Sequence, residues 1–115
     1  MSVIMYGIPN CDTIKKAKKW LEANGIDYEF HNYKKEGITK SKLKEWCKQT
    51  DWEILLNRRG TTWRKLDDAT KESINKTSAI DIMTEETSII KRPVVETGKE
   101  LLVGFSEDKF EATFK

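Results

Sequence analysis

The spacing of hydrophobic residues predicts a strand, a helix and a second strand in the first third of the chain. A short apolar run that begins at Val3 and contains β-branched residues is typical of a buried strand. Beyond Asp12 the period changes, and one helical stripe carries Ile14, Ala17 and Leu21. Asn24-Gly25 favours a helix end, and residues 26–33 then alternate between apolar and polar. This order predicts a right-handed crossover with parallel pairing of the two strands.

The middle of the chain has the pattern of short helices. After a surface turn at 34–37, residues 41–50 form a helical pattern with Leu43, Trp46 and Cys47 on one face. The apolar residues of 52–56 indicate a short turn or helix that covers the core. After a loop at 57–60, either Thr61 or Thr62 can cap the next helix. Two further polar-rich helices are predicted at 67–74 and 78–83, with Leu66, Ile74, Ile80 and Met83 turned inward.

The last third of the chain predicts a hairpin and a final helix. Residues 89–96 read as a strand, and Pro93 belongs near its start because a central proline would break the hydrogen-bond ladder. A glycine-containing turn at 97–100 leads to a partner strand at 101–105, so the pair is expected to be antiparallel. Ser106 is a credible N-cap of the last helix, whose Phe110 and Phe114 face inward.

Composition limits the classes of function. The 115 residues are enough for one domain, and 37% hydrophobic with 35% charged residues indicates a heavily charged surface. The net charge of +2 is too balanced for nucleic acid or a membrane surface to be the main partner. No apolar run is long enough to span a bilayer, and no signal-peptide pattern opens the chain. We therefore expect a cytoplasmic protein, and we expect it to be a monomer.

Cys11 is the candidate nucleophile. It lies where the first loop passes into a helix N-terminus, and unpaired N–H groups and the helix dipole there favour a thiolate. The alternative is an inert, buried cysteine. Ile14 stands where a thioredoxin C-x-x-C motif has its second cysteine, and Cys47 is better explained as a core neighbour of Trp46. One histidine and two distant cysteines offer no metal cluster. His31, at the end of a strand, is expected to be exposed rather than catalytic.

Three segments resemble the ArsC family, in its YffB-like branch. They are residues 6–17 (YGIPNCDTIKKA), 56–66 (LNRRGTTWRKL) and 89–93 (IIKRP). The family comprises glutaredoxin-type arsenate reductases, Spx transcriptional regulators and small YffB-like proteins. The resemblance implies an α/β, thioredoxin-like (glutaredoxin-type) fold with a four-stranded mixed sheet. The whole chain, 1–115, would be a single domain, with a core of about 1–37 and 87–115 and a helical insertion of about 38–86.

The resemblance also implies a site around Cys11. Arg59 and Arg92 match two of the arginines that surround the cysteine in the family's arsenate reductases, although Arg58 can replace Arg59 after a one-residue loop shift. Pro93 matches the cis proline of thioredoxin-like folds. The loop residues Asn10, Asp12 and Thr13 complete the substrate-binding set, since backbone N–H groups there can hold an oxyanion or a thiolate.

The predicted function is that of a glutathione-dependent thiol oxidoreductase. Glutathione brings its own thiol, so one cysteine suffices, and glutaredoxin is a further possible partner. Arsenate fits less well, because residues 104–108 carry no basic residue where arsenate reductases have a further arginine. Two alternatives stay open: an Spx-like regulator that docks on RNA polymerase without catalysis, and a true arsenate reductase. No metal cofactor is expected.

Overall fold

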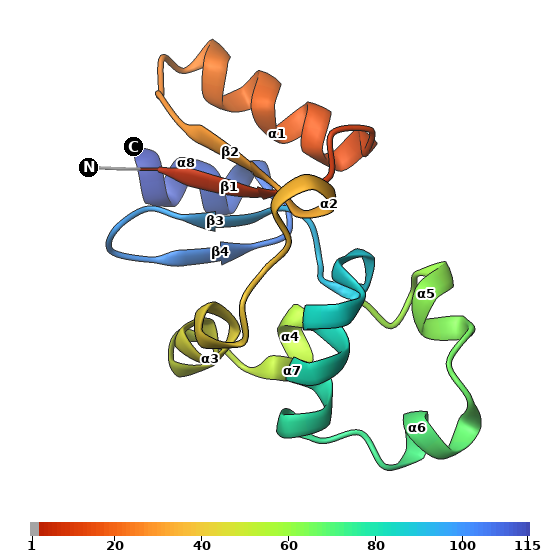
Figure 1. The fold of residues 1–115 in the computed structure, drawn as a ribbon. Coiled ribbons are helices and arrows are strands. Elements are labelled where there is room, and N and C mark those ends of the chain that lie inside the picture. The colour runs from red at the N-terminus through yellow and green to blue at the C-terminus, as the bar shows by residue number, and fades with distance from the viewer. Residues whose placement is uncertain (1–2) are drawn as a thin grey trace. The chain divides into compact units, whose positions relative to one another are not determined.

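The computed structural model describes residues 3–115, which form two compact units (Figure 1). The first unit, here the sheet unit, consists of the chain up to Glu36 together with Arg92–Lys115. The second, the helical unit, consists of Gly37–Lys91. Among residues 3–115, no helix is both long and apolar enough to cross a membrane.

The sheet unit contains a four-stranded mixed sheet in the order β2-β1-β3-β4. Its strands are β1 (Ile4–Gly7), β2 (Glu29–Asn32), β3 (Val94–Glu96) and β4 (Leu101–Val103). β1 and β2 are parallel, whereas β1 pairs antiparallel with β3, and β3 with β4. The predicted strand–helix–strand crossover, the hairpin and the α/β class are therefore confirmed, and the sheet is mixed because the hairpin joins it through β3.

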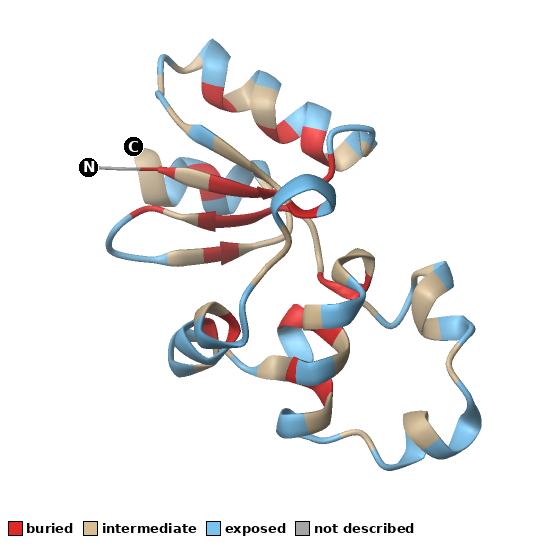
Figure 2. Ribbon diagram, viewed as in Figure 1, coloured by how far each residue is buried: buried red, intermediate tan, exposed pale blue. Residues whose placement is uncertain are grey.

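Two helices cover one face of this sheet, α1 (Asp12–Ala23) and α8 (Glu107–Phe114). Their apolar stripes share one core with the strands, formed by Val3, Met5, Ile14, Ala17, Leu21, Val95, Leu102 and Phe110. Trp20 of α1 meets the ring of Phe110 edge-on, with centroids 5.4 Å apart. Figure 2 shows the buried positions on the sides of α1 and of the strands that face each other. Gly25 follows the end of α1 with a φ of +68°, and Ser106 caps α8, as predicted.

The helical unit packs around α7. It contains α3 (Lys40–Gln49), α4 (Trp52–Leu55), α5 (Thr61–Arg64), α6 (Asp68–Glu72), α7 (Lys76–Glu85) and a 3₁₀ turn, η1 (Thr87–Ile89). α7 contacts α3, α4 and η1. The buried apolar side chains of the helical unit are Leu43, Trp46, Leu55, Leu56, Ala79, Ile80, Met83, Ile89 and Ile90. An antiparallel bridge joins Leu56, which follows α4, to Ile90, which follows η1.

The structure corrects two predicted strand boundaries. Ile89 ends the 3₁₀ turn and Ile90 bridges to Leu56, so the predicted strand at 89–96 begins only at Val94. The first apolar residues of the predicted strand, Ile89 and Ile90, pack in the helical unit instead of the sheet. The second strand is also shorter than the alternating pattern, because Tyr33 opens the short helix α2 (Tyr33–Glu36) where a surface turn was predicted.

Two local predictions in the helical unit were wrong. Neither Thr61 nor Thr62 caps α5: Gly60 holds the N-cap position, and the Thr62 hydroxyl instead shares a 2.8 Å hydrogen bond with Ser88. Ile54, expected to help cover the core, is 47% exposed. One turn of helix at α4 turns Leu55 inward, and the adjacent side chain then faces outward.

Candidate functional site

The loop between β1 and α1 places Cys11 at the N-cap of α1. Cys11 has extended backbone angles (φ −104°, ψ 128°), and its carbonyl accepts the first helical hydrogen bond from the N–H of Lys15 at 3.0 Å. Gly7 ends β1 directly beneath the helix, since a Cβ there would overlap the fully buried Ile14. The close packing of the end of β1 against the start of α1 holds the Cys11 sulfur at the N-terminus of the helix. The Cys11 side chain is only half-buried there.

The environment of Cys11 favours the thiolate. Burial acts to raise the pKa of the thiol, but hydrogen bonding from the N–H groups of Ile14 and Thr13 and the positive charge of Arg92 outweigh it. The net result is a pKa below the ordinary value of a cysteine. The Cys11 side chain makes no capping hydrogen bond of regular geometry, so the N–H groups of the first turn are available to an anion.

Strand pairing brings Arg92 to Cys11. β3 lies antiparallel to β1 with Val94 opposite Tyr6, so the residues just before β3 lie beside the loop that follows β1. Arg92 is half-buried there. Its guanidinium stabilises the Cys11 thiolate through its positive charge and through hydrogen bonding, and both effects lower the pKa of Cys11. The Arg92–Pro93 peptide bond is cis, as the resemblance implied for this proline. The carbonyl of Pro93 accepts a 2.8 Å hydrogen bond from the N–H of Gly104.

A cluster of polar aromatic residues, Tyr6, His31 and Tyr33, lies near Arg92, and no sequence pattern predicted it. The Tyr6 hydroxyl donates a 2.7 Å hydrogen bond to the Glu96 carboxylate. Tyr33 is buried, and its hydroxyl makes no hydrogen bond with any residue of 3–115. Burial and the neighbouring Tyr6 and Glu96 raise the pKa of Tyr33, although the charge of Arg92 opposes them. The only sequence signal for this cluster is that Tyr6 and Glu96 are polar residues in strands otherwise rich in apolar residues.

The surroundings of Cys47 and His31 indicate structural rather than catalytic roles. Cys47 is half-buried on α3, and burial raises the pKa of its thiol, so it lacks the activation of Cys11. His31 is not the exposed strand-end residue that we expected. Its ring lies 4.7 Å from that of Tyr6, and its Nδ1 is 3.7 Å from a Glu36 carboxylate oxygen. Aromatic packing across adjacent strands therefore explains His31.

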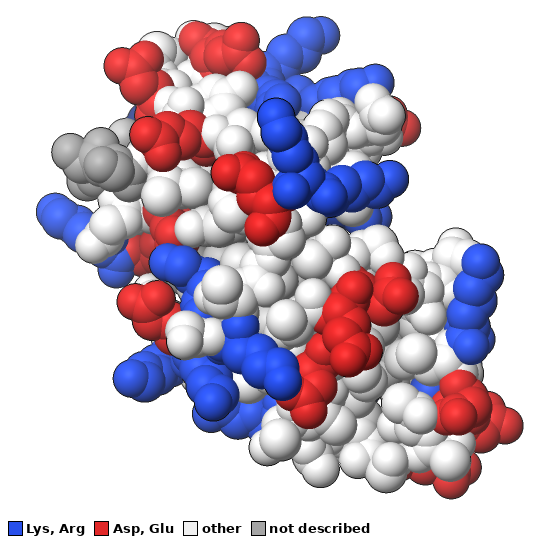
Figure 3. Space-filling view, in the orientation of Figure 1, with Lys and Arg blue, Asp and Glu red and all other residues white. Residues whose placement is uncertain are grey.

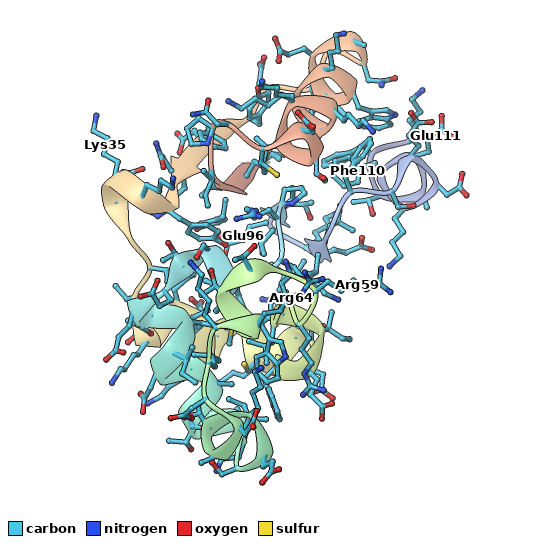
Figure 4. All side chains as sticks on the ribbon, turned by 90° about the vertical axis from the view of Figure 1, so that its right-hand side faces the viewer. Lys35, Arg59, Arg64, Glu96, Phe110 and Glu111 are labelled. Atoms are coloured by element: carbon cyan, nitrogen blue, oxygen red, sulfur yellow. The ribbon has the colours of Figure 1, made fainter. Side chains whose placement is uncertain are left out.

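The two neighbouring arginines of the helical unit differ in their contacts. Arg58 lies 3.9 Å from the Glu53 carboxylate, and its guanidinium lies over the rings of Trp52 and Trp63, 5.9 and 5.5 Å from their centroids. Arg59 is exposed on the loop before α5 (Figure 4), where its backbone N–H donates to the Asn57 side chain. Of the two, Arg59 is thus the one whose guanidinium no described residue engages.

The remaining loop residues contribute differently to the site. Asn10 and Asp12 are exposed, and Thr13 is half-buried with its backbone N–H directed at the sulfur. Within the described part of the chain, no group of three or more His, Cys, Asp or Glu is placed to hold a metal ion. The site therefore combines one activated thiol, one guanidinium and two backbone donors, which is chemistry suited to nucleophilic attack on sulfur.

Comparisons with known proteins agree with this architecture. The model of the ArsC family matches residues 6–113. The solved structure of the YFFB protein has a TM-score of 0.95 and 45% identity, covering 99% of this chain and 100% of that one. An arsenate reductase (ArsC) related protein from Brucella melitensis has a TM-score of 0.79 and 50% identity, with coverages of 100% and 96%. The global transcriptional regulator Spx of Lactiplantibacillus plantarum is 32% identical, over 93% of this chain and 82% of its own.

Proposed function

Because the chain belongs to the ArsC family, we propose that it is a cytoplasmic, glutathione-dependent thiol oxidoreductase with Cys11 as its nucleophile. The observation that supports this most directly is the place of Cys11 at the N-cap of α1, where the N–H groups of Ile14 and Thr13 and the charge of Arg92 lower the pKa of its thiol. A thiolate, not a thiol, attacks sulfur, so a larger ionised fraction at neutral pH raises the reaction rate.

The proposed reaction is thiol–disulfide exchange. The Cys11 thiolate attacks one sulfur of a disulfide, so that a mixed disulfide forms, the original S–S bond breaks, and the second sulfur leaves as a thiolate that takes a proton from solvent. A glutathione thiolate then attacks the glutathionyl sulfur, or the substrate sulfur, bound to Cys11. This second exchange breaks the bond to Cys11 and releases it as a thiolate. The two-electron oxidation is then held by the new disulfide that contains glutathione. Glutaredoxin can take the place of glutathione in that step.

Other side chains are proposed to bind the co-substrate. Arg92 stabilises the thiolate and is available to a glutathione carboxylate as the sulfur becomes neutral in the mixed disulfide. We assign Arg59, rather than Arg58, a second carboxylate or oxyanion, because Arg58 already lies over two indole rings and near Glu53. Asn10, Asp12, Thr13 and Pro93 would form the rim of the binding site.

Mass spectrometry after treatment with oxidised glutathione tests this proposal. The wild-type chain and Cys47→Ser should each gain a glutathionyl group at Cys11, and Cys11→Ser should not. Arg92→Ala should form the adduct more slowly at neutral pH, because the charge that favours the thiolate is gone. An unmodified Cys11, or an adduct formed only at Cys47, would contradict the proposal.

Two other functions are carried by relatives and need separate assays. The resemblance to the regulator Spx suggests a protein that docks on RNA polymerase without catalysis. Co-purification with polymerase subunits that Cys11→Ser leaves unchanged would favour it. The relation to an arsenate reductase-related protein suggests arsenate as a substrate. We expect weak or no turnover in assays coupled to glutathione and glutaredoxin, because residues 104–108 provide no further guanidinium.

A further inference from the structure

The helical unit has a lysine-lined groove between α3 and α7, here called the α3–α7 groove. Its volume is about 510 Å³, and its lining includes Lys40, Lys44 and Lys48 of α3 with Lys76, Ile80 and Asp81 of α7. Figure 3 shows basic side chains gathered over α3. The three lysines of α3 recur every four residues, so they form one stripe along the helix. Eight residues of helix span about 12 Å, which sets the length of this stripe.

Lys40, Lys44 and Lys76 are placed where they do not help their own helices, whereas Lys48 lies in the last turn of α3, where the helix dipole favours a cation. Like charges four residues apart repel, so the spacing of Lys40, Lys44 and Lys48 disfavours α3. Lys40 and Lys76 also occupy the first positions of α3 and α7, where the helix dipole disfavours a cation. Neither helix has an acidic residue in its first turn. In α1 and α8 of the same chain, by contrast, the first turn is acidic.

Most of this charge is not neutralised within the described chain. Lys40 pairs with Asp81 at 2.9 Å. Lys44, Lys48 and Lys76 are exposed and have no carboxylate of residues 3–115 within ion-pair distance. Three uncompensated cations line one concavity, and Lys44 and Lys76 do so against local helix preferences, which indicates a role outside folding.

We propose that the α3–α7 groove binds an acidic segment of a partner protein. A stripe of about 12 Å presents successive ammonium groups to carboxylates repeated along a chain, as in a run of glutamates. The groove contains no arginine fork to recognise a phosphate in a bidentate way. The buried Ile80 lies at the bottom of the groove, so the charged groups that a ligand meets there are those of the lysines and Asp81. This site lies wholly in the helical unit and does not depend on the thiol chemistry of Cys11.

Fluorescence anisotropy with a labelled oligoglutamate peptide of about ten residues tests the groove. The wild-type chain should bind it at low salt, and added salt should weaken the complex. The double variant Lys44→Glu/Lys48→Glu should weaken binding by about tenfold or more, because two attractions become repulsions. The matched control Lys16→Glu/Lys19→Glu reverses two exposed lysines of α1 and should leave the affinity nearly unchanged. Circular dichroism should show all variants folded, since each of these lysines is exposed.

A second variant separates the groove from general charge attraction. Asp81→Asn removes the acid that competes for Lys40 and should strengthen peptide binding, which a purely structural role of Asp81 would not do. Equal loss in the two double variants, or no binding by the wild-type chain, would overturn the proposal. So would tighter binding of inorganic tripolyphosphate or of single-stranded oligothymidylate to the groove, since either would indicate another class of ligand.

Discussion

Substitution of Gly7 by alanine should destabilise the sheet unit and disturb Cys11 at the same time. A Cβ at position 7 would overlap Cδ1 of Ile14 and lie 3.0 Å from its Cγ1. Ile14 is fully buried in the core under α1, so it has no free space to move into. Overpacking of this kind costs about 1–3 kcal/mol. The loss of glycine entropy in the unfolded chain returns about 0.4–1 kcal/mol, since the φ of Gly7 is not positive.

The net destabilisation is therefore about 1.3 kcal/mol, the middle of the difference between these two ranges. For a domain of this size it lowers the thermal midpoint by roughly 4–8 °C. Thermal unfolding followed by circular dichroism measures this shift. The N–H of Ile14 is also one of the groups that lower the pKa of Cys11. Displacement of Ile14 should thus move the pH profile of Cys11 alkylation toward higher pH.

A double-mutant cycle with Ile14→Val decides whether the contact is the cause. Ile14→Val alone removes the overlapping methyl and costs about 0.5–1.5 kcal/mol. In the double variant Ile14→Val makes room for the new methyl of Gly7→Ala. The double variant should therefore be destabilised by less than the sum of the two single variants. Gly60→Ala is the matched control, because a Cβ there meets only the side chain of Asn57. Additive effects, or an unchanged midpoint for Gly7→Ala, would refute the argument.

Three further perturbations test other parts of the structure. Alkylation of Cys11 by iodoacetamide should begin at lower pH than for a free cysteine, and Arg92→Ala should shift that profile upward, because the lowered pKa keeps the thiolate at pH values below the ordinary thiol range. An unshifted profile in Arg92→Ala would exclude the contact. Tyr33→Phe should be neutral or stabilising by up to about 1 kcal/mol in urea unfolding, because it removes a buried hydroxyl without a partner among residues 3–115; a clear loss of stability would mean that the hydroxyl is hydrogen-bonded in solution. Asn75→Ala should lower stability by about 1 kcal/mol, since the Asn75 and Ser78 side chains form a reciprocal capping box at the start of α7. A smaller effect in thermal unfolding would indicate that packing of α7 outweighs its cap.

The elements of the sheet unit were predictable because each depends on neighbours in sequence. The stripe of Ile14, Ala17 and Leu21 predicts α1 whatever else the chain does, and the turn at 97–100 predicts the hairpin. The place of Cys11 at a helix start follows from the same local change of period. Boundaries were less certain, since Ile89 and Ile90 are as apolar as strand residues but pack in the helical unit.

The sequence by itself determined which elements form and where the reactive sulfur lies along the chain, because hydrophobic period, turn residues and caps act over a few positions. Only the tertiary structure decided which side chains meet. The register of β3 against β1 carries Arg92 across more than eighty residues of chain to Cys11, and it also brings Glu96 to Tyr6. The convergence of lysines from α3 and α7 likewise required two helices to pack. Long-range pairing depends on the whole core, so no local pattern could specify these contacts.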